Sequence, residues 1–263
     1  MQQFQQEMDV IGNDIANVNT TGFKSASVQF ADALSQNLEM TGSGGTTQIG
    51  TGVTTEAITN QFTQGSINTT GKDSDLAISG NGFFLVRDPI SGATYATRAG
   101  DFGLDSSGYL ITSAGMRVQG YSDPGLSTLG DIQIDGNGGT SSSSTISGYA
   151  IGTDGKITVT PGDATPSFIR GQVLLQNFTS PEALVKEGDN LYSNLSAAGQ
   201  MSQPAAPKTS GLGTIESDSL EASNVDLTIE FSDMITAQRA FEASSKIITT
   251  SDEMLQTLVN LKR

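Results

Sequence analysis

The chain has 263 residues, enough for one large domain or two small ones. Its 31 glycines, 7 prolines and 35% apolar residues are more typical of a turn-rich β protein than of a disordered one. The net charge of −15 argues against a nucleic-acid partner, because phosphate binding needs clustered lysine and arginine. The absence of cysteine and histidine excludes disulfides, Ser-His and Cys-His catalysis, and thiolate or imidazole metal sites.

The start of the chain, "MQQFQQEMDV", has neither the basic nor the apolar region of a secretory signal peptide. The longest strictly apolar run is "FFLV" at 83–86, which is far too short to cross a bilayer. We therefore expect no membrane insertion.

The first 18 residues predict an amphipathic helix, because apolar residues recur there in steps of three and four. Such a helix would be about 27 Å long and marginal on its own, so its apolar stripe needs a partner. The stripe consists of Met1, Phe4, Met8, Ile11, Ile15 and Val18.

The passage "NDIANVNTTGFK" (13–24) predicts the end of this helix. Its asparagine and threonine side chains can cap or turn the backbone, a glycine is placed for a left-handed helix stop, and a phenylalanine follows as an apolar anchor. We name these residues the helix-exit motif: Asn17, Asn19, Thr20, Gly22 and Phe23.

Between about residues 40 and 220 the pattern changes to short strands separated by turns. Segments such as "FFLVR" (83–87) and "MRVQGY" (116–121) are strand-like, and their spacing predicts a β-meander that is barrel-like. The glycine-rich "MTGSGGTTQIGTG" (40–52) predicts a flexible loop, and "GGTSSSST" (138–145) predicts a low-complexity loop.

A second helix is predicted from about 225 to 261, where the sequence contains no glycine or proline. It would be about 55 Å long. Ser223 and Asn224 are candidate N-caps, and the β-branched "IITTS" (247–251) is its weakest point. Its apolar stripe includes Leu227, Phe231, Met234, Phe241, Ile248 and Leu255.

These elements predict an α+β fold, in which a mainly-β domain is inserted between terminal helices that pair as a coiled coil. The helical domain with its linker would comprise 1–35 and 221–263, and the β-rich domain 36–220. Both crossings between the domains should then lie close together. The alternative is that each stripe packs on its own globular domain. Because the second helix is twice as long as the first, part of its stripe needs residues before Met1 or a second molecule as cover.

No catalytic, metal-binding or cofactor-binding residues are predicted. "GTDGK" (152–156) lacks the spacing of a phosphate loop and predicts a hairpin turn, while "DIQIDGNGG" (131–139) lacks the glutamate of a calcium loop. Acid pairs such as "DSD" (73–75) are weak candidates for glycoside hydrolysis, since the chain has no tryptophan to line a sugar cleft. We expect a non-enzyme, with a surface adhesin as a binding alternative.

Three long blocks resemble the flagellar rod and hook protein family. They are "MDVIGNDIANVNTTGFKSASVQFADAL" (8–34), "DLAISGNGFFLVRD" with "YATRAGDFGLDSSGYLITSAGMRVQGY" (75–88 and 95–121), and "EASNVDLTIEFSDMITAQRAFEASSKIITTSDEMLQTLVNLKR" (221–263). They lie at the start, middle and end, so the resemblance covers the whole chain. Within the family, "NQFTQGSINTTGKDSDLAI" (60–78) and "TTSDEMLQTLVNLKR" (249–263) are most similar to a short hook protein.

The resemblance implies a structural subunit of the flagellar hook, exported by the type III apparatus and polymerised into a helical tube that passes torque from rod to filament. The alternative is the distal rod protein. Implied partners are copies of the same chain, the distal rod and hook–filament junction proteins, the hook cap and the export apparatus. Family members usually begin with a further helical segment, so we expect residues before "MQQFQQ" to be missing here.

Overall fold

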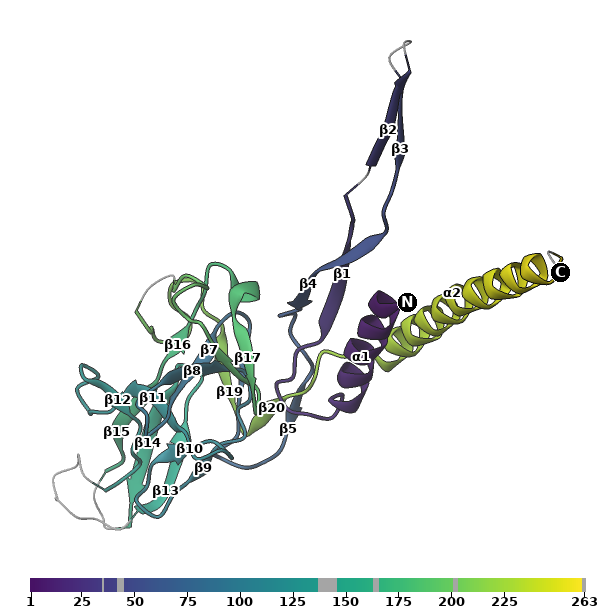
Figure 1. Ribbon diagram of the computed structural model, residues 1–263. Coiled ribbons are helices and arrows are strands. Elements are labelled where there is room, and N and C mark those ends of the chain that lie inside the picture. The colour runs from purple at the N-terminus through teal and green to yellow at the C-terminus, as the bar shows by residue number, and fades with distance from the viewer. Residues whose placement is uncertain (35, 42–44, 137–145, 163–165, 201–202, 262–263) are drawn as a thin grey trace. The chain divides into compact units, whose positions relative to one another are not determined.

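The structure is a computed structural model that describes residues 1–34, 36–41, 45–136, 146–162, 166–200 and 203–261 (Figure 1). The predicted loop at 138–145 lies outside the described residues. The chain divides into two compact units, which we call unit 1 and unit 2. Unit 1 comprises Met1–Val18, Lys24–Gln61 and Val225–Arg263, and unit 2 comprises Asn19–Phe23 and Phe62–Asn224.

Unit 1 contains the two helices, α1 (Gln2–Ala16) and α2 (Leu227–Leu261), which pack against each other. They run antiparallel, since Glu7 interacts with Asp233 whereas Asp14 interacts with Glu230 (Figure 1). α2 continues without interruption through 247–251. There the hydroxyl of Thr250 donates to the carbonyl of Lys246 at 3.0 Å, so the β-branched side chains bond back to the helix instead of breaking it.

The N-cap of α2 differs from the prediction. Asp226 Oδ1 accepts a hydrogen bond from the amide of Thr228 at 2.8 Å, so Asp226 precedes the first helical residue as its cap. Asn224 instead donates to the side chain of Thr63 at 2.8 Å. The predicted caps, Ser223 and Asn224, were therefore placed two or three residues too early.

Unit 1 also contains two β-ribbons, each antiparallel: β1 (Ala26–Asp32) pairs with β4 (Val53–Asn60), and β2 (Gln36–Thr41) pairs with β3 (Gly45–Ile49). The prediction of a flexible loop at 40–52 was wrong for 40–41 and 45–49, which are strand residues, whereas 50–52 have no regular secondary structure. The segment "TTQI" (46–49) is rich in β-branched residues that favour extended backbone, and this preference outweighed the neighbouring glycines.

Unit 2 is built from short strands and one 3₁₀ turn, η1 (Pro181–Ala183). Its described strands are β5 (Ile67–Thr69), β6 (Leu76–Ser79), β7 (Phe83–Arg87), β8 (Thr94–Thr97), β9 (Gly103–Leu104), β10 (Leu110–Ile111), β11 (Arg117–Tyr121), β12 (Leu129–Asp131), β13 (Ile146–Ile151), β14 (Lys156–Pro161), β15 (Phe168–Val173), β16 (Leu175–Gln176), β17 (Val185–Gly188), β18 (Leu191–Ser193), β19 (Thr214–Ser217) and β20 (Ser219–Glu221).

The main sheet of unit 2 has the order β13-β14-β15-β11-β7-β8-β18-β17, with β10, β12 and β16 paired at its sides. Among the described strands the path ends at β13 and β17, so the sheet is open and not closed into a barrel. One face covers a core that includes Phe84, Val118 and Ile157. The hairpin turn predicted at 152–156 is confirmed, since the Gly152 amide donates to the Lys156 carbonyl between β13 and β14.

The predicted α+β class is confirmed: a β-rich insertion separates an N-terminal from a C-terminal helix (Figure 1). The chain enters and leaves unit 2 at one place. β20 pairs with β5 and β19 with β6, so the last strands of unit 2 lie on its first ones.

Candidate assembly surface

The predicted stripe of α1 faces α2 and the β1–β4 ribbon. Ile11 is buried, its neighbours along the stripe are half-buried, and Met1 at the end is exposed. The ring of Phe4 packs edge-on against Phe30 of β1, with 6.5 Å between centroids. The half-buried members of the stripe are Phe4, Met8, Ile15 and Val18.

Polar contacts also tie α1 to the ribbon. Gln3 Nε2 donates to the carbonyl of Val53 at 2.8 Å, and the Thr55 hydroxyl donates to Gln6 Oε1 at 2.6 Å. Reasoning from the sequence missed this second neighbour of α1. The alternation of Val28 and Phe30 with polar residues in "SVQFAD" was the available signal for a strand.

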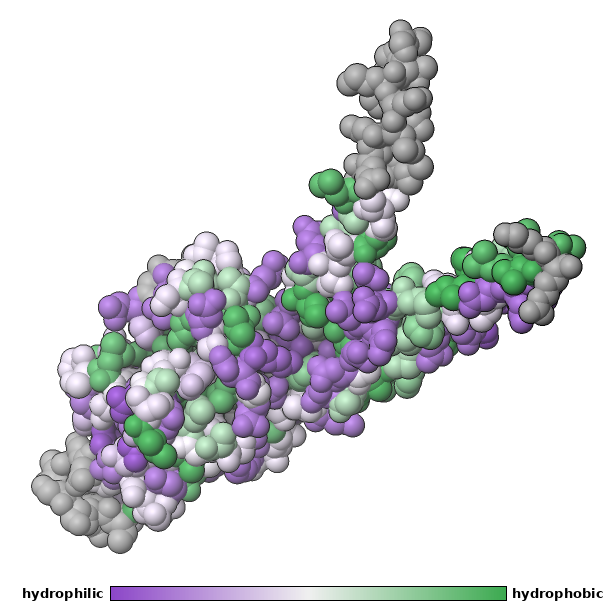
Figure 2. All heavy atoms as spheres, viewed as in Figure 1, coloured by the Kyte–Doolittle hydropathy of each residue, from purple (hydrophilic) through white to green (hydrophobic). Residues whose placement is uncertain are grey.

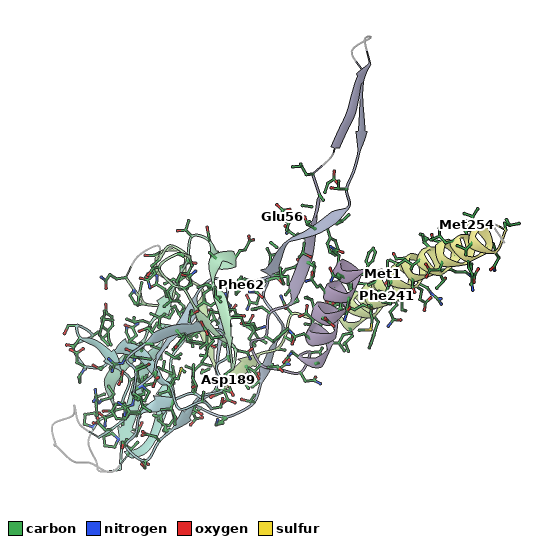
Figure 3. The ribbon with its side chains drawn as sticks, in the orientation of Figure 1. Met1, Glu56, Phe62, Asp189, Phe241 and Met254 are labelled. Atoms are coloured by element: carbon green, nitrogen blue, oxygen red, sulfur yellow. The ribbon has the colours of Figure 1, made fainter. Side chains whose placement is uncertain are left out.

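The stripe of α2 is covered along only part of its first half. Ala237 is buried and Met234 and Phe241 are half-buried where α1 packs. Figure 3 shows Phe241 within the part of α2 that lies near α1, and Met254 farther along, toward the free end. Within the N-terminal turns, Leu227 and Phe231 are also exposed.

Beyond Lys246, α2 presents an apolar face with no cover from the described part of the chain. Leu255 is 60% exposed and Leu261 is 83% exposed. Figure 2 shows hydrophobic residues gathered on this end of the helix. We call this face the free stripe of α2; it consists of Ile247, Ile248, Met254, Leu255, Leu258, Val259 and Leu261. An apolar face of this length on a solvent-exposed helix is typical of a protein–protein contact.

An acidic cluster lies beside the covered part of the helix pair. Burial, together with the charge of Asp233, raises the pKa of Glu7. Burial and the charges of Asp14, Asp233 and Asp226 raise the pKa of Glu230. Because like charges this close repel one another, the helix pair carries an electrostatic cost at neutral pH.

The helix-exit motif ends α1 and seats the following segment in unit 2. Asn17 closes the helix, as its amide and its side-chain nitrogen both donate to the carbonyl of Asn13. Asn19 and Thr20 follow, and the Thr20 carbonyl accepts from the amide of Phe23. Phe23 is buried, with the Lys186 ammonium 3.7 Å from its ring centroid.

Gly22 has a different role from the predicted one. Its φ is +66°, but it lies five residues beyond the C-cap and does not stop the helix. Its amide donates to the carbonyl of Glu221 at 2.8 Å, and a Cβ at this position would lie 2.6 Å from the backbone nitrogen of Ala99. The glycine is required because the segment 19–23 passes directly over the end of β8.

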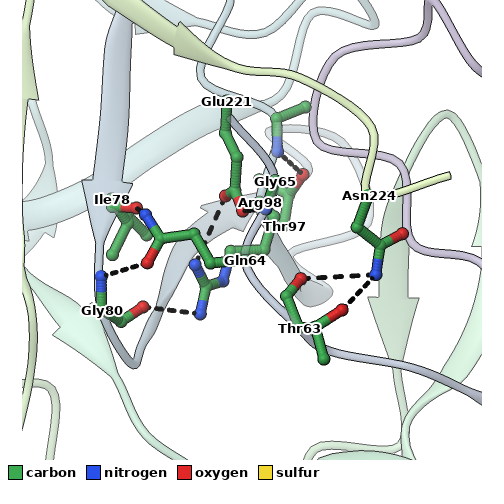
Figure 4. A network of polar contacts seen from close by, with 10 residues as sticks. Thr63, Gln64, Gly65, Ile78, Gly80, Thr97, Arg98, Glu221 and Asn224 are labelled. Atoms are coloured by element: carbon green, nitrogen blue, oxygen red, sulfur yellow. Dashed lines mark hydrogen bonds and ion pairs between the residues drawn. The ribbon is translucent and has the colours of Figure 1, made fainter. Parts of the chain in front are cut away.

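A buried polar network joins the same region of unit 2 (Figure 4). Arg98 is almost fully buried; its Nη1 lies 3.3 Å from Glu221 Oε2, and its Nη2 donates to the Gly80 carbonyl at 3.0 Å. Glu221 Oε1 accepts from the amide of Gly65 at 3.0 Å. Gln64 bridges the Ile78 carbonyl and the Gly80 amide. The sequence offered no local signal for this network, because its two charged members are 123 residues apart.

Within the described residues, no group of three or more acidic side chains is arranged to hold a metal ion. None of the described helices is long and apolar enough to cross a membrane.

Comparison with known proteins decides the family. Residues 1–24 match the family described as flagella basal body rod protein, 77–159 the flagellar hook protein FlgE/F/G D1 domain, and 216–261 the flagellar basal body rod FlgEFG protein C-terminal family. A flagellar basal-body rod protein FlgG of Bacillus subtilis (strain 168) is 41% identical, over all of this chain and 96% of its own length. The chain belongs to the flagellar rod and hook protein family.

Members of this family are structural proteins of the flagellum and not enzymes, as the sequence predicted. Two further relatives help to place the chain within the family. The FlgG of Agrobacterium fabrum is 36% identical over 95% of this chain and 91% of its own length. The flagellar hook protein FlgE of Treponema pallidum is 46% identical, but over only 46% of this chain and 27% of its own length. The rod protein relatives therefore match this chain along nearly their whole length, whereas the hook protein relative matches over about a quarter of its own.

Proposed function

We propose that this chain is a subunit of the distal rod of the flagellar basal body. The relatives that match along nearly their whole length are named basal-body rod proteins, whereas the hook relative matches over about a quarter of its length. In this role the chain polymerises into a tube that carries torque from the motor toward the hook. The hook subunit remains the second candidate, because the matched part of the hook relative is the more identical.

The free stripe of α2 is the observation that supports polymerisation most directly. In a single chain these side chains face solvent, and burying one leucine contributes about 1.5–3 kcal/mol. We propose that the stripes of α1 and α2 together form the assembly surface. We also propose that the helices line the tube and that the β-rich part, predicted at 36–220, packs outside them. Flagellar neighbours and the type III export apparatus are proposed partners.

The test compares two substitutions on one helical turn of the full chain. Leu255→Asp places a charge on the free stripe, while Gln256→Asp adds the same charge at an exposed polar position next to it. Leu255→Asp should abolish polymers in sedimentation and electron microscopy, and Gln256→Asp should leave them intact. Both variants should fold like the parent, since neither side chain is buried in the monomer. Normal polymers from Leu255→Asp would contradict the proposed surface.

Rod and hook are separated by microscopy of basal bodies from a strain that lacks the gene. Loss of a distal rod subunit should leave a shortened rod without a hook. A rod of full length that lacks only the curved hook would instead support the hook assignment.

A further inference from the structure

The chain passes into or out of unit 2 through three segments: 19–23, 62–66 and 219–224. Boundaries between compact units usually fall in exposed, flexible linkers that make few contacts. Here each of them contacts the same buried pair, Arg98 and Glu221, and all the contacts lie within unit 2.

Glu221 reaches two of the crossings directly. Its backbone carbonyl accepts from the amide of Gly22 in the first segment, and its carboxylate Oε1 accepts from the amide of Gly65 in the second. The third segment contains Glu221 itself and is held further by the Ala222 amide, which donates to the Ser66 carbonyl at 2.8 Å. One residue therefore connects all three crossings.

Arg98 anchors this residue to the main sheet. It follows directly on β8, pairs with Glu221 Oε2 and donates to the carbonyl of Gly80. The Cβ that Gly22 lacks would lie 2.7 Å from the carbonyl carbon of Arg98, so the first crossing rests on the Arg98–Ala99 backbone itself. The Asn190 side chain also holds that crossing, since it donates to the carbonyl of Thr21 at 2.8 Å.

We propose that Arg98 and Glu221 form a latch that fixes the three crossings of unit 2 as one cooperative element. Removing one partner leaves a buried charge unpaired, which is strongly unfavourable, so the crossings are seated together or released together. A force transmitted to unit 2 along the chain then acts on the three crossings together at the Arg98–Glu221 pair, and not on three independent linkers. The latch is independent of whether the polymer is rod or hook.

Hydrogen exchange of the full-length chain tests the latch with Glu221→Gln. Glutamine keeps an oxygen for the Gly65 amide but carries no charge for Arg98. If the contacts were merely local, the amides of Gly22, Gly65 and Ala222 would keep their protection. A cooperative latch predicts that exchange at all three rises together by at least tenfold, while β14, in the same sheet but away from the crossings, is unchanged.

Two further variants complete the test. Arg98→Met should raise amide exchange in the same three segments more strongly. If Arg98→Met also raises exchange in β14, unit 2 as a whole is destabilised, and the result with the milder Glu221→Gln variant is the one that tests the latch. Arg117→Met is the matched control, since it removes a partly exposed ion pair with Asp131 in the same unit and contacts no crossing. Release of only one segment by Glu221→Gln, or of none, overturns the proposal, as does equal release by Arg117→Met.

Discussion

Gly22 provides the sharpest test of how the chain is seated at the entrance to unit 2. The Cβ introduced by Gly22→Ala destabilises the folded state in two ways. A residue with a side chain loses about 1–2 kcal/mol in the left-handed region, where the φ of +66° lies. The Cβ also lies 2.6 Å from the Ala99 nitrogen, and because the obstacle is backbone, relief of this overlap adds about 1–3 kcal/mol. Together these predict that the free energy of unfolding of unit 2 falls by about 2–5 kcal/mol.

Gly115→Ala is the matched control. Its φ is +80°, but nothing lies within 4 Å of the Cβ position, so alanine there has only the free-energy cost of the left-handed backbone conformation. The chain has no tryptophan and its five tyrosines all lie in unit 2, so tyrosine emission during urea unfolding reports on unit 2 without the helices. If Gly22→Ala and Gly115→Ala lower the midpoint equally, the close approach over β8 contributes nothing and the argument fails.

Two further predictions concern the helix pair. The pKa values of Glu7 and Glu230 are raised in the folded state, so folded unit 1 binds protons more tightly than the unfolded chain does. The helix pair should therefore gain stability as the pH falls from 7 toward 4.5, and lose that stability as the pH rises again. Thermal unfolding followed by far-ultraviolet circular dichroism should show this pH dependence. The Glu7→Gln/Glu230→Gln double variant should be more stable than the parent at pH 7, and its stability should change less with pH. If its stability changes with pH as steeply as that of the parent, the prediction is wrong. Asp226→Ala removes the cap of α2 and should cost about 1 kcal/mol, whereas Asp226→Ser should cost little. Faster amide exchange in the first turn of α2, seen only with alanine, is the expected result.

The parts of the fold that the sequence could predict are those set by local periodicity. The heptad spacing from Met1 to Val18 and from Leu227 to Leu255 predicted both helices and their pairing. The end of α1 was predicted within the correct passage, but the helix is closed by asparagine at position 17 and not by the glycine that was expected to stop it. In each of these cases the signal and the structure lie within a few turns of one chain segment.

The parts that could not be predicted depend on contacts between distant segments. Gly22 was expected to have positive φ, and it does, but its reason is the backbone of Ala99, 77 positions later in the sequence. The β2–β3 ribbon was hidden by glycines that resemble a flexible loop. Arg98 gives no local signal of burial, because its partner, Glu221, lies 123 positions later in the sequence.

The residue types in the latch follow from what one buried side chain must do there. Arg98 directs one nitrogen to the Glu221 carboxylate and another to the Gly80 carbonyl, and its guanidinium lies 5.1 Å from the ring centroid of Phe83. A planar cation with several donors can make these contacts at once, whereas the single ammonium of lysine cannot. A buried ion pair adds little net stability over an apolar pair of the same size, but an unseated one is very unfavourable. Such a pair therefore discriminates against partly seated arrangements of the crossings more than it stabilises the seated one.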